Sequence, residues 1–218
     1  MDNYAVMIRR LVCACCLLLC AGLASGVAVG APVILILGDS LSAGYGLPTG
    51  TAWPVLLQRR LDTERYPYSV VNASISGDTT AGGRARLDAL LAQHRPAITV
   101  IELGANDGLR GGSIDAMRQN LDAMAATAQK VGSRVLLIGM RMPPNYGPGY
   151  VQRFDASFAE VANARKTGLV PFLFEGFADN EAMFQADRLH PLQSAQPRLL
   201  DNVWQALKPL LGAPGKTG

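Results

Sequence analysis

One aspartate and one histidine have the spacing that acid–base catalysis requires. They are Asp187 and His190, in the string "DRLHP". On a tight loop or helical turn, this spacing lets the carboxylate face the imidazole, fix its tautomer and stabilise the imidazolium. The other histidine, His94, lies at the end of a predicted helix just before a strand, where histidine typically complements the helix dipole at the surface. His190 is therefore the candidate base.

A histidine base needs a nucleophile, and the best-placed candidate is Ser40 in "GDSLS". It directly follows the apolar run 33–37, at a point where the next backbone N–H groups are free. The four cysteines all lie within residues 13–20, in a predicted export signal, so a serine or threonine must serve. Ser42, Ser76 and Thr79 are the competing candidates.

Acyl transfer also needs hydrogen-bond donors directed at the developing oxyanion. Gly77, in "SISGDTT", can present a backbone N–H with no side chain in the way. Asn106, in "GANDG", can offer its side-chain amide. Two carboxylates nearby have other expected roles. Asp39 should order its loop and the following helix, and Glu102, inside a predicted strand, must be paired or lie at the rim.

The elements that must position these residues alternate along the chain. The predicted strands are short and almost wholly apolar, as in parallel sheets covered on both faces, at 33–37, 69–73, 97–103, 134–139 and 169–174. Amphipathic helices are predicted between and after them, at 53–64, 80–93, 114–131, 151–166 and 194–211, with Thr80 and Ser113 as N-caps. Five such units predict one α/β domain over residues 32–218, a flavodoxin-like three-layer α/β/α sandwich with a five-stranded parallel sheet. The candidate residues follow the carboxyl ends of its strands, where this fold places its sites.

The same strings resemble a known family. The blocks "GDSLS", "SISGDTT", "GANDG" and "DRLHP" match those of the SGNH, or GDSL, hydrolases, over about residues 33–211. Longer strings such as "ILGDSLSAGYG" and "PPNYGPGY" are similar to the periplasmic thioesterase, lysophospholipase and arylesterase branch. The resemblance implies a catalytic triad of Ser40, Asp187 and His190. It also implies an oxyanion hole made by the Ser40 N–H, the Gly77 N–H and the Asn106 side chain.

The implied reaction is hydrolysis of an ester or thioester through an acyl-enzyme, with no cofactor and no metal. The resemblance favours aryl and short-to-medium acyl esters, acyl thioesters and lysophospholipids as substrates. The candidate substrate-binding residues on rim loops are Leu109, Met140, Met142, Pro143 and Tyr146. Two alternatives are a carbohydrate O-deacetylase of the same family and a non-catalytic flavodoxin-like binding module. A binding module has no need for the Asp187–His190 spacing.

The N-terminus has the pattern of a secretory signal peptide. Arg9-Arg10 precede the apolar run 11–24, and a small-residue stretch follows, with cleavage predicted after Ala31. Gly26 and Ala28 are alternative cleavage sites. The signal peptide, residues 1–31, predicts a periplasmic or secreted enzyme. Because residues 11–38 carry no charge, an uncleaved membrane anchor is the alternative.

Composition limits the partners. Hydrophobic residues make up 49% of the 218-residue chain, the formal net charge is only +3, and no run of five or more Lys/Arg occurs. These features exclude a disordered chain and predict no nucleic-acid surface. The expected partner is a small-molecule ester or thioester. Membrane contact is expected only through the signal segment or lipid substrates, and a monomer is the working expectation.

Overall fold

The computed structural model describes residues 30–215, and all of these after Gly30 belong to one compact unit. The predicted signal peptide lies almost wholly outside the described residues, as do all four cysteines. Within residues 30–215, none of the helices has the length and apolar character needed to cross a membrane.

A five-stranded parallel sheet forms the centre of this unit, as predicted. Its strands lie in the order β2-β1-β3-β4-β5. Their bounds are Val33–Gly38 (β1), Ser69–Asn72 (β2), Ile98–Glu102 (β3), Arg134–Ile138 (β4) and Gly168–Val170 (β5). The side chains of Ile34–Leu37 in β1 are fully buried, and every residue of β3 is buried. The continuous apolar runs in the sequence therefore reflect strands covered on both faces.

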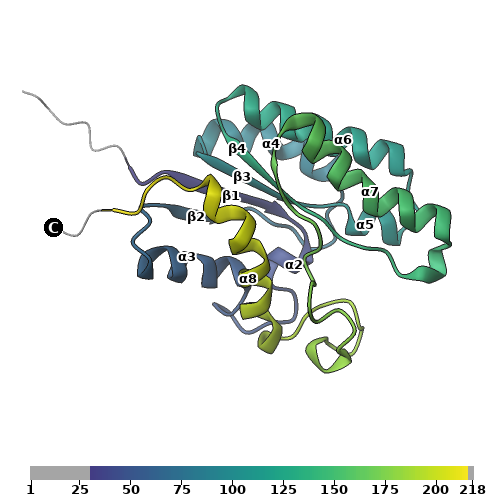
Figure 1. Cartoon of the computed structure of the whole chain (residues 1–218). Helices are drawn as coiled ribbons and strands as arrows, with labels where there is room; N and C mark the ends of the chain where they lie inside the picture. The colour runs from purple at the N-terminus through teal and green to yellow at the C-terminus, as the bar shows by residue number, and fades with distance from the viewer. Residues whose placement is uncertain (1–29, 216–218) are drawn as a thin grey trace, which may run out of the picture. The chain divides into compact units, whose positions relative to one another are not determined.

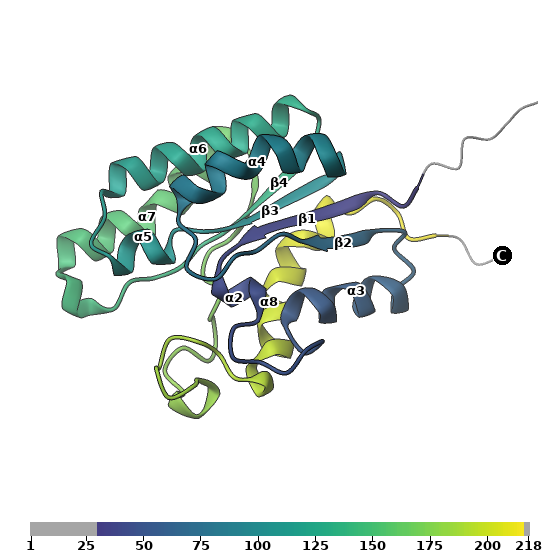
Figure 2. The same ribbon diagram turned by 180° about the vertical axis from the view of Figure 1, so that it is seen from behind.

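Helices cover both faces of the sheet (Figures 1 and 2). One face carries α3 (Trp53–Thr63) and α8 (Gln196–Leu207), which pack on each other. The other face carries α4 (Thr80–His94), α6 (Ile114–Lys130) and α7 (Pro148–Arg165), packed side by side in that order. Two short helices, α2 (Ser40–Ala43) and α5 (Ala105–Leu109), directly follow β1 and β3. The predicted three-layer α/β/α sandwich is confirmed.

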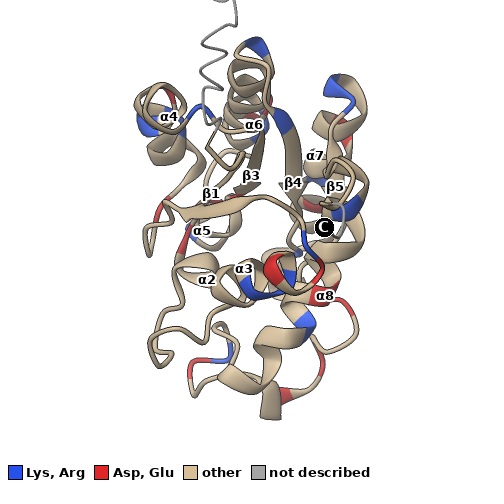
Figure 3. Cartoon of the chain, turned by 90° about the vertical axis from the view of Figure 1, so that its left-hand side faces the viewer, with Lys and Arg blue, Asp and Glu red and all other residues tan. Residues whose placement is uncertain are grey.

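Charged residues of both signs are interspersed on these helices. In the view of Figure 3, blue Lys/Arg segments alternate with red Asp/Glu segments rather than gathering over one element. Many of these charges form exposed ion pairs, such as Arg153 with Asp115 and Arg118 with Glu160.

The last helix is predicted over 194–211 but is α-helical only over Gln196–Leu207, with 3₁₀ turns at Gln193–Ala195 and Lys208–Leu210. Three other predicted boundaries are wrong for a local reason. β5 ends at Val170 rather than 174, because Pro171 has no N–H to continue the ladder. α7 begins three residues earlier than predicted, with Pro148 at its first position, where proline's fixed φ suits a helix start. The N-cap of α4 is Thr79, whose hydroxyl accepts from Gly82 N, and not Thr80.

The strand order creates the place where the site is built. The chain moves from β1 outward to β2, then returns past β1 to β3 and continues outward to β5. The connections leaving the carboxyl ends of β1 and β3 therefore diverge, and this divergence is where open α/β sheets bind their ligands. Gly38 at the end of β1 pairs with Glu102 at the end of β3, so the loops that carry Ser40 and Asn106 start side by side.

Candidate active site

Three side chains from two distant segments form a continuous hydrogen-bonded chain. Ser40 Oγ lies 2.8 Å from His190 Nε2, and His190 Nδ1 lies 2.7 Å from Asp187 Oδ2. Ser40 is the first residue of α2, and the other two residues lie on the turn that precedes α8. The distances suit proton transfer from a hydroxyl to an imidazole whose tautomer is fixed by a carboxylate. His94, by contrast, is the last residue of α4, at the end of the sheet where β3 begins.

Asp187 is held as a carboxylate by the turn it belongs to. Its Oδ1 accepts hydrogen bonds from the backbone N–H groups of Leu189 at 2.9 Å and His190 at 3.0 Å. Partial burial alone would raise the pKa of Asp187, but the His190 and Leu189 N–H groups and the His190 imidazole outweigh it. Together they lower the pKa from 3.8 to about 2. The spacing Asp187-x-x-His190 thus lets one carboxylate cap its own turn and face the imidazole.

Contacts made by Tyr45 and Gln185 at the histidine turn were not apparent from the sequence. The Tyr45 ring lies against the His190 ring, with centroids 4.6 Å apart. Gln185 Nε2 donates to Tyr45 O at 2.8 Å, and Gln185 N donates to His190 O at 2.8 Å. These contacts tie the loop after α2 to the histidine turn. No sequence pattern joins positions so far apart.

The turn from β1 into α2 depends on small residues that pack closely. A Cβ on Gly38 would lie 2.8 Å from both Ser42 and Ser74 side-chain atoms, so only glycine fits there. Asp39 then caps α2 by accepting from Leu41 N at 3.0 Å.

The structure also separates Ser40 from the three competing hydroxyl groups. Ser42 is fully buried and donates to Glu102, which leaves it unavailable to a substrate. Thr79 is the N-cap of α4. Ser76 lines the cavity beside the site but, within residues 30–215, makes no hydrogen bond with His190. Of the four hydroxyl groups, Ser40 is thus the one bonded to the imidazole.

Two backbone N–H groups at the site, those of Ser40 and Gly77, are free to act as donors. Within residues 30–215, neither Ser40 N nor Gly77 N donates a hydrogen bond. Gly77 has a φ of +80°, a conformation that suits glycine, and its carbonyl accepts from Arg110 Nη2 at 2.9 Å. Arg110 thereby holds the Gly77 peptide in place.

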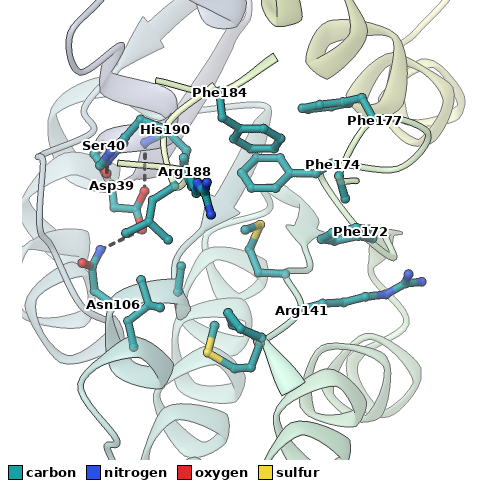
Figure 4. Close-up of a pocket in the computed structure, with 18 of the residues that line it drawn as sticks. Asp39, Ser40, Asn106, Arg141, Phe172, Phe174, Phe177, Phe184, Arg188 and His190 are labelled. Carbon is teal, nitrogen blue, oxygen red and sulfur yellow. Dashed lines mark hydrogen bonds between the residues drawn. The ribbon is translucent and has the colours of Figure 1, made fainter. Parts of the chain in front are cut away.

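Asn106, the second residue of α5, brings a side-chain donor to the same site. Its Nδ2 donates to Asp39 Oδ2 at 2.9 Å (Figure 4). It also donates to Asp78 O at 2.9 Å. Both amide hydrogens are therefore engaged, and any further acceptor must share one of them. The strength of the hydrogen bonds to Asp39 and Asp78 therefore influences how readily this amide can donate to another atom.

Asp39 and Glu102 form a buried carboxyl pair next to Ser40. Asp39 is 1% exposed and Glu102 is 0% exposed. Burial raises the pKa of Asp39 to about 6, against the opposing hydrogen bonds from Leu41 and Asn106 and the attraction of His190. Burial, and then repulsion by Asp39, raises the pKa of Glu102 well above its ordinary value. The sequence predicted that Glu102 is either paired or at the rim of the sheet, and in the structure it is buried and paired.

A cavity of about 1200 Å³ opens beside Ser40 and His190. Four of the five predicted substrate-binding residues line it, namely Leu109, Met140, Met142 and Pro143. Tyr146 is not among the lining residues. Its hydroxyl donates to Leu109 O at 2.9 Å and its ring stacks on Tyr150, so it supports the loop that carries Leu109.

The sequence analysis missed the aromatic wall of this cavity. Four phenylalanines between β5 and α8 pack ring against ring with centroids 5.4–5.8 Å apart, and all line the cavity (Figure 4): Phe172, Phe174, Phe177 and Phe184. The composition of residues 169–174 predicts a buried strand, and a buried strand would place its apolar side chains in the core rather than around a cavity. Arg141 and Arg188 also line the cavity, with Arg141 over the Phe172 ring at 4.5 Å.

Comparison with known proteins shows what the chain is similar to. The profile of the GDSL-like Lipase/Acylhydrolase family matches residues 36–196. "Esterase TesA" of Pseudomonas aeruginosa is 56% identical over 181 residues, covering 83% of this chain and 90% of that protein. "Arylesterase" of Vibrio mimicus is 42% identical over 80% of this chain and 87% of its own length. "Thioesterase 1/protease 1/lysophospholipase L1" of Escherichia coli K12 is also 42% identical, over 84% of this chain and 87% of its own length.

Solved structures give the same picture. The crystal structure of TesA superposes with a TM-score of 0.80, covering 82% of this chain and 99% of that one at 56% identity. The psychrotrophic esterase EstA from Pseudoalteromonas sp., inhibited by monoethylphosphonate, superposes with a TM-score of 0.78 at 42% identity, covering 81% and 97% of the two chains.

The lowered pKa of Asp187 predicts a specific pH dependence of stability. A carboxylate whose pKa is depressed in the folded state stabilises the protein above its ordinary pKa, and this contribution disappears as the pH falls through the folded-state value. Asp187→Asn should therefore lower the free energy of unfolding at pH 5, and the deficit should shrink between about pH 4 and pH 2. Denaturant unfolding of both proteins across this range measures it. Asp88→Asn, at an exposed position of α4, is the control, and a deficit of unchanged size at pH 2 would contradict the prediction.

Proposed function

We propose, for a chain that belongs to the GDSL-like lipase/acylhydrolase family, that Ser40 is the nucleophile, His190 the general base and then acid, and Asp187 its orienting carboxylate. The observation that carries this proposal is the chain of two hydrogen bonds, 2.8 Å and 2.7 Å long, that joins the three side chains. The chain is a carboxylic-ester hydrolase, as are the relatives named esterase and arylesterase.

The reaction proceeds in two steps through an acyl-enzyme. His190 Nε2 takes the proton of Ser40 Oγ as the oxygen attacks the substrate carbonyl carbon. The resulting imidazolium faces Asp187, and it then gives the proton to the departing alcohol or thiol. Water repeats the sequence on the acyl-enzyme, which releases the acid and restores Ser40.

The tetrahedral intermediate carries a negative oxygen that the site must stabilise. The Ser40 and Gly77 N–H groups, free of other partners within the described chain, suit this role. The Asn106 amide supplies a third donor when it shares the hydrogen now directed at Asp39 or Asp78. Together the three donors come from the ends of β1, β2 and β3, so the sheet fixes their separation.

The cavity supports acyl and aryl groups as the parts of the substrate that bind. Its aromatic and methionine side chains offer an apolar wall of the size that small-molecule sites have. We therefore assign aryl and short-to-medium acyl esters, acyl thioesters and lysophospholipids as substrates, in line with the relatives named arylesterase and thioesterase/lysophospholipase. The phenyl-lined wall favours these over the sugar esters of a carbohydrate O-deacetylase. The complete triad geometry argues against a binding module.

We also propose that the chain is exported and cleaved after Ala31. The support is the basic start, apolar run and small-residue stretch of residues 1–31. When the full chain is made in a bacterial host, the activity should appear in the periplasmic fraction, and N-terminal sequencing should begin at Pro32. Full-length protein retained in the membrane fraction would instead support an uncleaved anchor.

Replacing the nucleophile tests the proposed mechanism. Ser40→Ala should reduce turnover of p-nitrophenyl butyrate by at least about 10³-fold, because the acyl-enzyme cannot form. A fluorophosphonate probe should label the wild type and not this variant. Ser194→Ala, which removes an exposed serine just before α8, is the matched control and should retain both properties. Labelling that survives in Ser40→Ala would show that another residue is the nucleophile.

The apolar cavity predicts a dependence on acyl-chain length. Burying each methylene contributes about 0.8 kcal/mol, so kcat/KM for p-nitrophenyl esters should rise up to about fourfold per added CH₂ until the cavity is filled. Phe174→Leu enlarges the space beside the aromatic wall and should move the optimum to longer chains, as a series from acetate to dodecanoate would show. Trp204→Phe, on α8 and outside the cavity lining, should leave the profile unchanged. A profile that is flat in the wild type would contradict acyl binding in this cavity.

A further inference from the structure

The mechanism above makes no use of Glu102, although this carboxyl lies directly behind the nucleophile. It is the last residue of β3, fully buried, and opposite Gly38 in the register. Its neighbour Asp39 is 1% exposed. Two carboxyls so deeply buried are costly, and within the described chain neither forms a salt bridge.

The contacts of Glu102 suit a protonated carboxyl. Its Oε2 accepts from Ser42 Oγ at 2.7 Å and from Asp39 N at 3.4 Å. Its Oε1 is buried and receives no hydrogen bond from any group in residues 30–215. An ionised carboxylate would leave that oxygen without a donor, whereas a proton on it becomes a donor to the adjacent Asp39 carboxyl.

The contacts of Asp39 suit a carboxylate. Oδ1 accepts from Leu41 N at 3.0 Å and Oδ2 accepts from Asn106 Nδ2 at 2.9 Å. Both of these partners are hydrogen-bond donors, as an ionised carboxyl requires. Asn106 is also the side chain proposed to donate to the oxyanion. A hydrogen-bonded path thus runs from Ser42 through Glu102 and Asp39 to Asn106.

We propose that Glu102 is a positioning residue for the oxyanion site: it shares a single proton with Asp39, and the pair holds the Asn106 amide where the oxyanion forms. The inference rests on the proposed function for the role of Asn106. The sharing of the proton stands on the burial and contacts of the two carboxyls. A buried pair with one proton carries one negative charge, which the Leu41 and Asn106 donors satisfy. A pair with none would place two charges together without a cation.

The charged groups around the pair fit this state. His190 faces Asp39 from the catalytic turn, and its attraction favours an ionised Asp39. A guanidinium group next to Gly38, that of Arg86 on α4, donates to Gly38 O at 3.4 Å but is paired with Asp78. Asp107 on α5 accepts from Thr80 N and Oγ1. Because the nearby Arg86 is already paired, a proton is the available means of removing one of the two charges.

Two substitutions of Glu102 separate positioning from packing. Glu102→Gln keeps the shape, can accept from Ser42 and can donate to Asp39, so kcat should stay within about threefold of the wild type. Glu102→Leu keeps the volume but leaves Ser42 and Asp39 without their partner. Its kcat for p-nitrophenyl butyrate should fall about 10- to 100-fold with KM little changed, because the Asn106 donor acts in the transition state. Thr99→Val is the matched control. Thr99 lies on β3, as Glu102 does, and forms a buried hydroxyl pair with Ser133; removing this pair should leave kcat unchanged.

The proton itself can be observed without an enzyme assay. Infrared spectra at neutral pH should show the carbonyl stretch of a buried protonated carboxyl in the wild type and in Ser40→Ala, and not in Glu102→Gln. Absence of this band in the wild type would overturn the shared proton, whatever the activity. A kcat of Glu102→Leu within twofold of the wild type would overturn the positioning role, as would a Glu102→Gln enzyme that is folded but as impaired as Glu102→Leu. If Glu102→Leu does not fold, the Gln variant and the infrared band decide the question. An inactive wild type that retains the band would fault the proposed function and not the carboxyl pair.

Discussion

The hydrogen bond between Ser40 and His190 joins residues 150 positions apart, and the rest of the fold serves to close it. Ser40 is fixed by the end of β1, a central strand whose register to β2 and β3 leaves little freedom. His190 lies on an irregular turn and has no such ladder. It is held through α8, the next helix along the chain: Trp53 N donates at 3.0 Å to Gln196 Oε1, which fastens the start of α3 to the start of α8. The packing of these two helices thereby sets where the imidazole lies relative to the hydroxyl.

Backbone dipoles and carboxylates dominate the electrostatics of the site. The backbone N–H groups of Ser40 and Gly77, which donate no hydrogen bond within residues 30–215, are the proposed donors to the negative charge that develops on the substrate. Asp187 accepts from the imidazole, and Asp39 also attracts a positive charge on the same ring. The carboxylate that caps α2 therefore acts on the histidine as well as on its own helix. Burial strengthens this effect, because fewer water molecules screen the charges.

The sequence predicted the parts of the molecule whose signals are local. Continuous apolar runs located all five strands, and the order of the loops after them located Ser40, Gly77, Asn106 and the Asp187–His190 pair. The features it missed depend on contacts between distant positions. "LVPFLF" looks like one strand from its composition, yet Pro171 ends β5 and turns the phenylalanines toward the cavity. The burial of Ser42 and its bond to Glu102 join positions 60 residues apart, so a serine that looked like a competing nucleophile proved to be a buried donor.

Chemistry and substrate selection are therefore carried by parts of the fold with different mechanical support. Ser40 and the proposed oxyanion donors lie within about five residues of strand ends, where ladder hydrogen bonds and buried side chains fix the backbone, whereas His190 is held through α8. The cavity wall lies in the segment between β5 and α8, whose order comes from tight turns and stacked phenyl rings. Ring packing tolerates substitutions of similar volume better than a strand register tolerates a shift. Changes in the aromatic segment can thus alter which acyl group fits while the carboxyl pair and Ser40 keep their positions.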